Sequence, residues 1–507
     1  MKPFQGVISI TDGKIDFTEP SSGFVRIISN RKNFHFGGCC ALPGLVDSHG
    51  HISALGEKLN SLSLDNAGSP EECIDKALSY NKLRSGWLLG YGWNQEGWEI
   101  KKFPDKNILD RCLSDTPVVF IRQDGHSAWV NSAALSIARI GRNASSPKSG
   151  IIEKDKSGNP TGILVDDAME LVRQHIPGLS AKDISENIIS GLNICVENGL
   201  TEIHDMDVEP GQIAIFDELS ASNLLPLKVH SYIKGQQNEY LHSKVEHFDN
   251  NFFGICGIKL YADGALGSRS AALLEPYSDS PDTKGLLMLS ALELRNKSLN
   301  ALERGFQVAV HAIGDAANRM CLDVFSDLRK IFKDAVLRIE HAQIVHPKDQ
   351  MRFGDLNVIA SVQPIHCLSD AAMAQQRLGL ERCSYSYPWK SLIDSETVVC
   401  CGSDFPIESQ NPFWGIEALT HRIPFKQENP WFPAECLTFE DALQVYTQTP
   451  HIASGIKNNR GAFEKGYDAD FAIIKENFLG TNPDEIVKNR IEAVFVDGKM
   501  KYSKNRF

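Results

Sequence analysis

Residues 42–52, LPGLVDSHGHI, end an apolar run with two histidines that a single glycine separates. On an extended chain, side chains two positions apart project to the same side, so His49 and His51 can reach one metal ion. Imidazole nitrogen is a good ligand for Zn²⁺ and related divalent ions. A chain with 15 histidines also produces such a pair by chance, and the two would then only shape a turn. The rest of the chain has to decide between these interpretations.

The middle of the chain repeats a short apolar run that ends in a polar residue. The runs are ALPGLVDSH, GLTEIHD, LPLKVHSYI, GIKLYAD, FQVAVHAIGD, LRIEHAQ, VIASVQPIH and VVCCGSDFP. Helical patterns separate them, such as AKDISENIISGLNICVENG at 181–199, whose apolar face repeats every 3.6 residues. Strands that alternate with helices form right-handed parallel β/α units, and eight such units close a barrel. We therefore predict an α/β fold built on a (β/α)8 TIM barrel.

Both ends of the chain carry hairpin patterns. VISITDGKIDF near the start and AVFVDGKMKY near the end place Asp-Gly between alternating apolar residues, and RGAFEKGYDADFAII adds another strand-like segment. Neither end is long enough to bury a core alone. We expect residues 1–44 and 451–507 to form one composite β-sandwich and residues 45–450 to form the barrel. The long gap between the first two strands predicts an inserted subdomain at about 60–175.

Composition excludes several classes of function. The net charge of −12, with no basic run, argues against a nucleic-acid partner. No apolar run approaches the ~20 residues that span a bilayer, and the N-terminus lacks the apolar core of a signal peptide. The 12 cysteines are scattered without a Cys-x-x-Cys pair, which is typical of reduced, buried thiols. We expect a cytoplasmic protein without a membrane partner. A homodimer is compatible with such a barrel, but no sequence feature requires one.

Side chains of the types found in metal sites stand at or near the ends of the predicted strands. Barrel enzymes keep their chemistry at the carboxyl ends of their strands. These residues are His49, His51, His204, Lys259, His311, His341 and Asp404. His311 and His341, from neighbouring strands, are positioned to hold a second ion. Two adjacent cations need an anionic bridge, and spacing alone does not identify it.

The motifs VDSHGH, IKLYADGALGS, VHAIGD, IEHAQ and GSDFP, followed by GYDADFAII, resemble the amidohydrolase superfamily over nearly the whole chain. The chain is similar to the amidohydrolase 3 branch, which includes N-substituted formamide deformylases, where segments like DGHSAWVNSAAL and FADGALGS recur. The resemblance implies a metal-dependent hydrolase that cleaves the C–N bond of a small-molecule amide or formamide, other than a peptide bond.

The resemblance also implies a ligand set. The implied ligands are His49, His51, Lys259, His311, His341 and Asp404. They would bind two divalent ions, with Zn²⁺ expected, and CO2 would convert Lys259 into a bridging carbamate. Metal ions lower the pKa of a bound water from ~15.7 towards ~7, which supplies hydroxide at neutral pH. Asp404 would be the catalytic group that accepts the proton of this hydroxide and passes it to the leaving amine.

Four further residues are candidates for substrate binding. His126 lies in the DGHSAWVN segment of the insertion, and His204 and His366 end the second and seventh strands. Local hydrogen bonding or packing is the alternative for each histidine. Trp93 stands with Trp87 and Trp98 in a cluster that would form either an aromatic wall for the substrate or the core of the insertion.

Three rival functions come into question, of which the first is disfavoured. A deaminase on the same barrel would carry a Glu soon after the fifth-strand histidine and lack the lysine, whereas this chain has Asp315 and Lys259. A cyclic amidohydrolase would use the same ligands to open a ring. A binding or regulatory protein on an inactive hydrolase scaffold belongs to a different class, and the loss of a ligand would have favoured it.

Overall fold

The computed structural model describes residues 3–29, 32–123, 125, 127–147, 150–245, 252–455, 459–475, 487 and 491–505. The described chain forms two compact units, Ser53–Gly191 and the remainder, Met1–Ile52 with Leu192–Phe507. The first is longer at both ends than the insertion expected at about 60–175. The chain passes between the units through helices α1 (Ile52–Leu59) and α6 (Ala181–Glu197).

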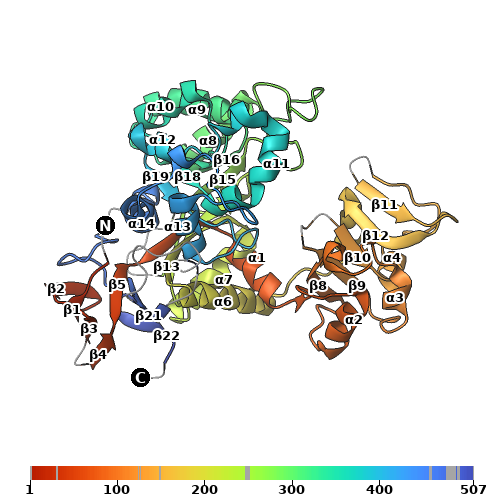
Figure 1. Ribbon diagram of the computed structural model, residues 1–507, viewed down its shortest axis with the longest axis horizontal. Helices are drawn as coiled ribbons and strands as arrows, with labels where there is room; N and C mark the ends of the chain where they lie inside the picture. Colours follow the sequence, from red (N-terminus) through yellow and green to blue (C-terminus); the bar gives the residue numbers. More distant parts are fainter. Residues whose placement is uncertain are drawn as a thin grey trace. The chain divides into compact units, whose positions relative to one another are not determined.

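An eight-stranded sheet of parallel strands forms the centre of the larger unit (Figure 1). Its strands follow the chain in order and match the eight predicted runs, which confirms the predicted barrel. They are β6 (Leu45–Gly50), β13 (Leu200–Val208), β14 (Lys228–Lys234), β15 (Phe253–Tyr261), β16 (Gln307–Ala312), β17 (Leu337–His341), β18 (Ile359–Val362) and β19 (Val399–Cys401).

Backbone hydrogen bonds join the first strand to the segment after the last. Asp404 N donates to His49 O over 2.7 Å, and His51 N donates to Phe405 O over 2.9 Å. Gly50 and Phe405 pair in the parallel sense. The ring of strands therefore closes next to the His-x-His motif.

Helices follow the barrel strands, as β/α units require. They include α7 (Pro210–Ala221), α8 (Ala291–Glu303), α9 (Asp315–Ile331), α10 (Pro347–Asp355), α11 (Pro364–Cys383), α12 (Trp389–Asp394), α13 (Pro412–His421), α14 (Phe439–Thr447) and α15 (Thr449–Ala453). Helix α8 begins with a capping box, in which Ser290 and Glu293 bond each other's backbone N–H. Helix α9 buries an apolar face that includes Leu322, Phe325 and Leu328.

Strands from both chain ends share a second core. One sheet has the order β2-β1-β3-β4, and the other has the order β22-β21-β20-β5. In Figure 1 the red strands of the N-terminus lie beside the blue strands of the C-terminus. The strands are β1 (Gly6–Thr11), β2 (Lys14–Pro20), β3 (Phe24–Ser29), β4 (Lys32–Gly37), β5 (Cys39–Pro43), β20 (Phe471–Lys475), β21 (Ile491–Val496) and β22 (Lys499–Ser503). Ile8, Ile27, Phe471 and Phe495 meet in the shared core.

The two Asp-Gly turns form the predicted hairpins. Asp12 and Gly13 join β1 to β2, and Asp497 and Gly498 join β21 to β22. All four residues have positive φ, which is typical of a type I′ turn.

The run ALPGLVDSH, predicted as one strand, divides at Gly44 between the terminal sheet and the barrel. Residues before Gly44 belong to β5 and residues after it belong to β6. A Cβ on Gly44 would lie 2.2 Å from Thr201 Oγ1, so only glycine fits where the chain changes sheets.

The smaller unit contains a six-stranded sheet with the order β11-β12-β10-β9-β8-β7. Its strands are β7 (Leu62–Ser63), β8 (Leu88–Trp93), β9 (Val118–Arg122), β10 (Ser127–Val130), β11 (Gly150–Lys154) and β12 (Pro160–Asp166), and its helices include α2 (Pro70–Ser79), α3 (Lys106–Asp110), α4 (Ser132–Ile137) and α5 (Glu170–Arg173). Trp93, Trp98 and Trp129 are buried together in one of its two cores.

Candidate metal centre

The six predicted ligands lie together at the carboxyl ends of the barrel strands. His49 lies at the end of β6, His51 directly follows that strand, and Asp404 follows β19. Each of His49, His341 and Asp404 offers a ligand atom within 4.8 Å of the other two. His51 Nε2 lies 3.0 Å from Asp404 Oδ1. The structure therefore brings candidate ligands from the first, sixth and eighth strands to one point.

The other two predicted ligands complete the cluster. Lys259 Nζ, from β15, lies 3.4 Å from His49 Nε2. The ring centroids of His311 and His341 are 4.5 Å apart, and those of His49 and His341 are 5.1 Å apart. The long side chains reach one another because neighbouring parallel strands place their ends on the same rim.

Burial keeps most of these imidazoles neutral. Burial and the nearby Lys259 lower the pKa of His49 to about 4 and that of His311 to about 3. Burial likewise lowers the pKa of His341. A neutral imidazole has the lone pair that a metal ion requires, so these histidines are in the ligating form at neutral pH.

Asp404 and Lys259 depart from their ordinary protonation in opposite senses. Burial would raise the pKa of Asp404, but His49, His366 and His51 hold it well below its ordinary value, so the carboxylate is ionised. Burial lowers the pKa of Lys259. A lowered pKa increases the fraction of neutral amine, which is the nucleophilic form of a lysine.

A proton or a metal ion must lie between His51 and Asp404. His51 Nδ1 is 3.0 Å from Met206 O, and its Nε2 is 3.0 Å from Asp404 Oδ1. Burial would lower the pKa of His51, but Asp404 raises it, so a protonated imidazole that donates from both nitrogens satisfies these contacts, and a metal ion on Nε2 would take the place of its second proton. Among the described residues, His341 Nδ1 is buried and has no hydrogen-bond partner. The donor set of imidazoles, carboxylate and amine therefore fits divalent metal ions.

Two buried charged residues that the sequence did not single out orient His49. His49 Nδ1 lies 2.7 Å from Glu340 Oε2, and Arg338 Nε donates to Glu340 Oε1 over 2.9 Å. A carboxylate behind a ligating imidazole fixes its tautomer and directs its other nitrogen to the metal. The alternation of charges in LRIEH, in an otherwise apolar strand, was the signal for this pair.

Asp47 supports the same motif from behind. Its carboxylate accepts from His49 N over 3.0 Å, from Ser403 N over 3.1 Å and from Ser403 Oγ over 2.6 Å. These bonds tie the strand of His49 to the segment between β19 and Asp404.

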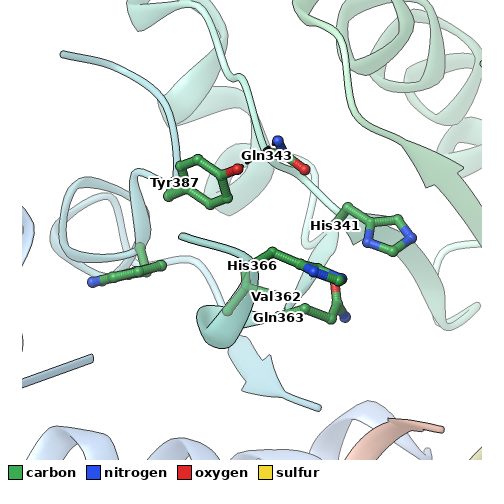
Figure 2. A pocket seen from close by; sticks show the side chains of 7 residues that line it. His341, Gln343, Val362, Gln363, His366 and Tyr387 are labelled. Atoms are coloured by element: carbon green, nitrogen blue, oxygen red, sulfur yellow. Dashed lines mark hydrogen bonds between the residues drawn. The ribbon is translucent and has the colours of Figure 1, made fainter. Parts of the chain in front are cut away.

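His366 lies between Asp404 and a pocket. Its Nε2 is 3.4 Å from Asp404 Oδ2, and its Nδ1 is 3.5 Å from Glu408 Oε1. Burial would lower the pKa of His366, but the two carboxylates raise it to about 10. Figure 2 shows His366 beside His341 in a pocket that is also lined by Gln343, Val362, Gln363, Tyr387 and Trp389. This pocket is next to the candidate metal ligands, and its volume of about 10 Å³ is room for about one water molecule.

The remaining predicted residues lie elsewhere. His204 is fully buried in the barrel, with its Nδ1 2.9 Å from Arg338 Nη1, so it reaches the cluster only through Arg338 and Glu340. Trp93 is fully buried in the smaller unit, where its indole N–H donates to Phe120 O over 2.8 Å. This is the packing alternative that the sequence left open. His126 lies outside the described residues.

Comparisons with known proteins agree with this geometry. Residues 37–502 match the model of the Amidohydrolase family. The chain is 32% identical to the protein LONG AFTER FAR-RED 3 of Arabidopsis thaliana, over 99% of this chain and 89% of that protein. It is 23% identical to an N-substituted formamide deformylase of Arthrobacter pascens, over 92% of this chain and 89% of that enzyme.

A solved structure gives a close match in fold. An uncharacterized metal-dependent hydrolase from Pyrococcus horikoshii OT3 superposes with a TM-score of 0.78 at 27% identity, over 95% of this chain and 98% of that one. Together the comparisons support a hydrolase that depends on divalent metal. With a family match that spans the barrel and the terminal sheet of β5, β20, β21 and β22, the chain belongs to the amidohydrolase family.

Proposed function

We propose that the protein hydrolyses the C–N bond of a small-molecule amide or N-substituted formamide, outside peptide chains. The observation that carries the proposal is the convergence of His49, His51, Lys259, His311, His341 and Asp404 on one rim of the barrel. The similarity to a formamide deformylase suggests the bond.

We propose that Lys259 is carboxylated and bridges two divalent ions, with Zn²⁺ as the expected metal. The neutral amine attacks CO2, forms an N–C bond and releases one proton to solvent, which leaves an anionic carbamate with two oxygens. The buried position of Nζ, 3.4 Å from His49 Nε2, and its lowered pKa support this modification. Bound divalent ions would lower the pKa of a water and polarise the substrate carbonyl.

The chain's own residues would move the proton. The ionised Asp404 accepts the proton of the attacking water and donates it to the leaving nitrogen as the C–N bond breaks. The products are a carboxylic acid and an amine. Glu340 holds His49 in the orientation that this site needs, and His366 holds the second oxygen of Asp404.

The first test is the metal content of the purified protein, measured by inductively coupled plasma mass spectrometry. We expect about two divalent ions per chain and a loss of metal in Lys259→Ala. Lys234→Ala is a matched control, because Lys234 pairs with Lys259 in the neighbouring strand but is 41% exposed and bound to Glu209. Metal-free wild-type protein after growth with supplied metal would contradict the proposal.

The second test is turnover. The metal-loaded protein is screened with N-formyl and N-acyl amines and with cyclic amides, in the presence of bicarbonate. Release of amine from the linear substrates would support the proposal, and turnover of cyclic amides alone would assign ring opening instead.

A further inference from the structure

A second cavity lies wholly within the smaller unit. Its volume is about 210 Å³, which suits a molecule of a few non-hydrogen atoms in an extended shape. It is lined by Glu57, Arg84, Leu89, Tyr91, Val119, Ile121, Arg173 and Ile176.

The floor of this cavity is apolar. Leu89 and Tyr91 alternate along β8, and Val119 and Ile121 alternate along β9, so all four project from the same face of the sheet. Ile176 adds a further aliphatic side chain to the lining. Most of the accessible lining of the cavity is polar, and these side chains supply its smaller apolar part, so the floor suits a short hydrocarbon body.

The walls are polar and carry one excess positive charge. Arg84 Nη1 donates to Glu57 Oε1 over 2.7 Å, and Arg84 Nε donates to Pro177 O over 2.9 Å, so this guanidinium is fixed in place. Arg173 is exposed, and among the described residues no carboxylate pairs with it. With Glu57 neutralised by Arg84, the charge of Arg173 is left for a ligand.

A hydroxyl group completes the polar wall. Tyr91 is partly buried, and its phenol makes no hydrogen bond to any described residue. Burial, followed by the charge of Glu57, raises the pKa of Tyr91, so the phenol keeps its proton and can donate. Arg173 and Tyr91 together offer hydrogen-bond donors above an apolar floor.

We propose that this cavity binds a small carboxylate with an apolar body. The carboxylate would accept from the Arg173 guanidinium and the Tyr91 hydroxyl, and the body would lie on Leu89, Val119 and Ile121. Such a site is separate from the residues of the metal centre, so the inference does not depend on the proposed reaction.

Isothermal titration calorimetry on the full-length protein tests the inference, with hexanoate and benzoate as probes. We expect one site per chain for each acid. Hexan-1-ol, which lacks the charge, and acetate, which lacks the body, should each bind at least about tenfold more weakly. Equal affinity for hexanoate and hexan-1-ol would overturn the proposal, as would the absence of hexanoate binding.

Variants locate the site. Arg173→Gln should weaken hexanoate binding about tenfold or more, and Tyr91→Phe, which keeps the ring, should weaken it severalfold. Arg139→Gln is the matched control, because Arg139 is an exposed arginine of the same unit that does not line the cavity. In Arg173→Glu the excess charge becomes negative, so hexylamine should bind in place of hexanoate. Unchanged hexanoate affinity in Arg173→Gln would contradict the assignment of the site.

Discussion

At the scale of single residues, the site depends on contacts in which one side chain fixes the tautomer or the ionisation state of its neighbour. His49 has Nε2 left for a metal ion because Glu340 engages Nδ1, and Asp404 is ionised because three histidines surround it. A conservative substitution can therefore separate chemistry from folding.

Asp404→Asn keeps the shape of the side chain and removes its capacity to accept a proton. We expect kcat to fall by about 10²–10⁴-fold with little change in the thermal midpoint. Steady-state kinetics and circular dichroism provide the measurement. Asp394→Asn, at an exposed aspartate that pairs with Lys390, should leave both quantities unchanged. Full activity in Asp404→Asn would remove this residue from the mechanism.

Several buried charges join the barrel to the terminal sheets. Asp468 accepts from Lys228 over 3.0 Å and from Arg460 over 2.7 Å, and Arg460 donates to Glu202 over 2.8 Å. Burial would raise the pKa of Asp468, but Lys228 and Arg460 lower it below its ordinary value of 3.8.

This shift predicts acid sensitivity. A carboxylate with a lowered pKa stabilises the fold above its unfolded pKa, and the contribution is lost as the pH falls through the folded pKa. Asp468→Asn should lower the thermal midpoint near pH 7, and its difference from the wild type should shrink as the pH falls below 3.8. Thermal melts from pH 7 to 2 test this, and a difference that grows on acidification would contradict it.

At the scale of elements, the contact between β6 and the end of β19 leaves no room for a side chain. A Cβ on Gly402 would lie 2.3 Å from His49 N and 2.7 Å from Asp47 Oδ1. The first of these atoms belongs to the backbone, so it cannot move away by a change of rotamer.

Gly402→Ala should therefore lower the free energy of unfolding by about 1–3 kcal/mol and reduce metal content, because it separates His49 from Asp404. Gly211→Ala, in helix α7, is the matched control, since a Cβ there meets no atom within 4 Å. It should be neutral or slightly stabilising. Urea unfolding and metal analysis of both variants test this. Gly402→Ala with wild-type stability and metal content would contradict the prediction.

The strands and their end residues were predictable because both signals are local. An apolar run that ends in His or Asp is visible in the sequence, and the eight runs occur in the order of the barrel. The boundary between the terminal sheets and the barrel was expected at residues 44 and 45. That the run ALPGLVDSH divides into two strands there was not predicted, because a continuous apolar run reads as a single strand. Arg338 and Glu340 escaped notice because two charges in a short strand look like a solvated face until the strand is placed inside a barrel.

At the scale of the whole molecule, the chain consists of two units with separate cores. The described residues include no helix long and apolar enough to cross a membrane. Because Trp93 lies in a core of the smaller unit, a substitution there tests the stability of that unit separately from the metal centre.

Trp93→Phe removes the indole N–H that bonds Phe120 O and leaves a gap in a fully buried position. We expect a loss of about 2–4 kcal/mol in the stability of the smaller unit and unchanged metal content. Limited proteolysis with mass mapping should show faster cleavage within 53–191. A variant with unchanged proteolysis and a raised KM would instead assign Trp93 to substrate binding.

The hydrogen bonds between His49 and Asp404 and between His51 and Phe405 have a consequence for biosynthesis. These bonds form the seam that closes the barrel. Its two partners are made at very different times, since the ribosome synthesises Asp404 long after His49. A nascent chain that stops before β19 has the histidines but neither the carboxylate nor the seam that sets their spacing. Metal loading would then follow completed synthesis, and the ion would be retained only by chains that have finished folding.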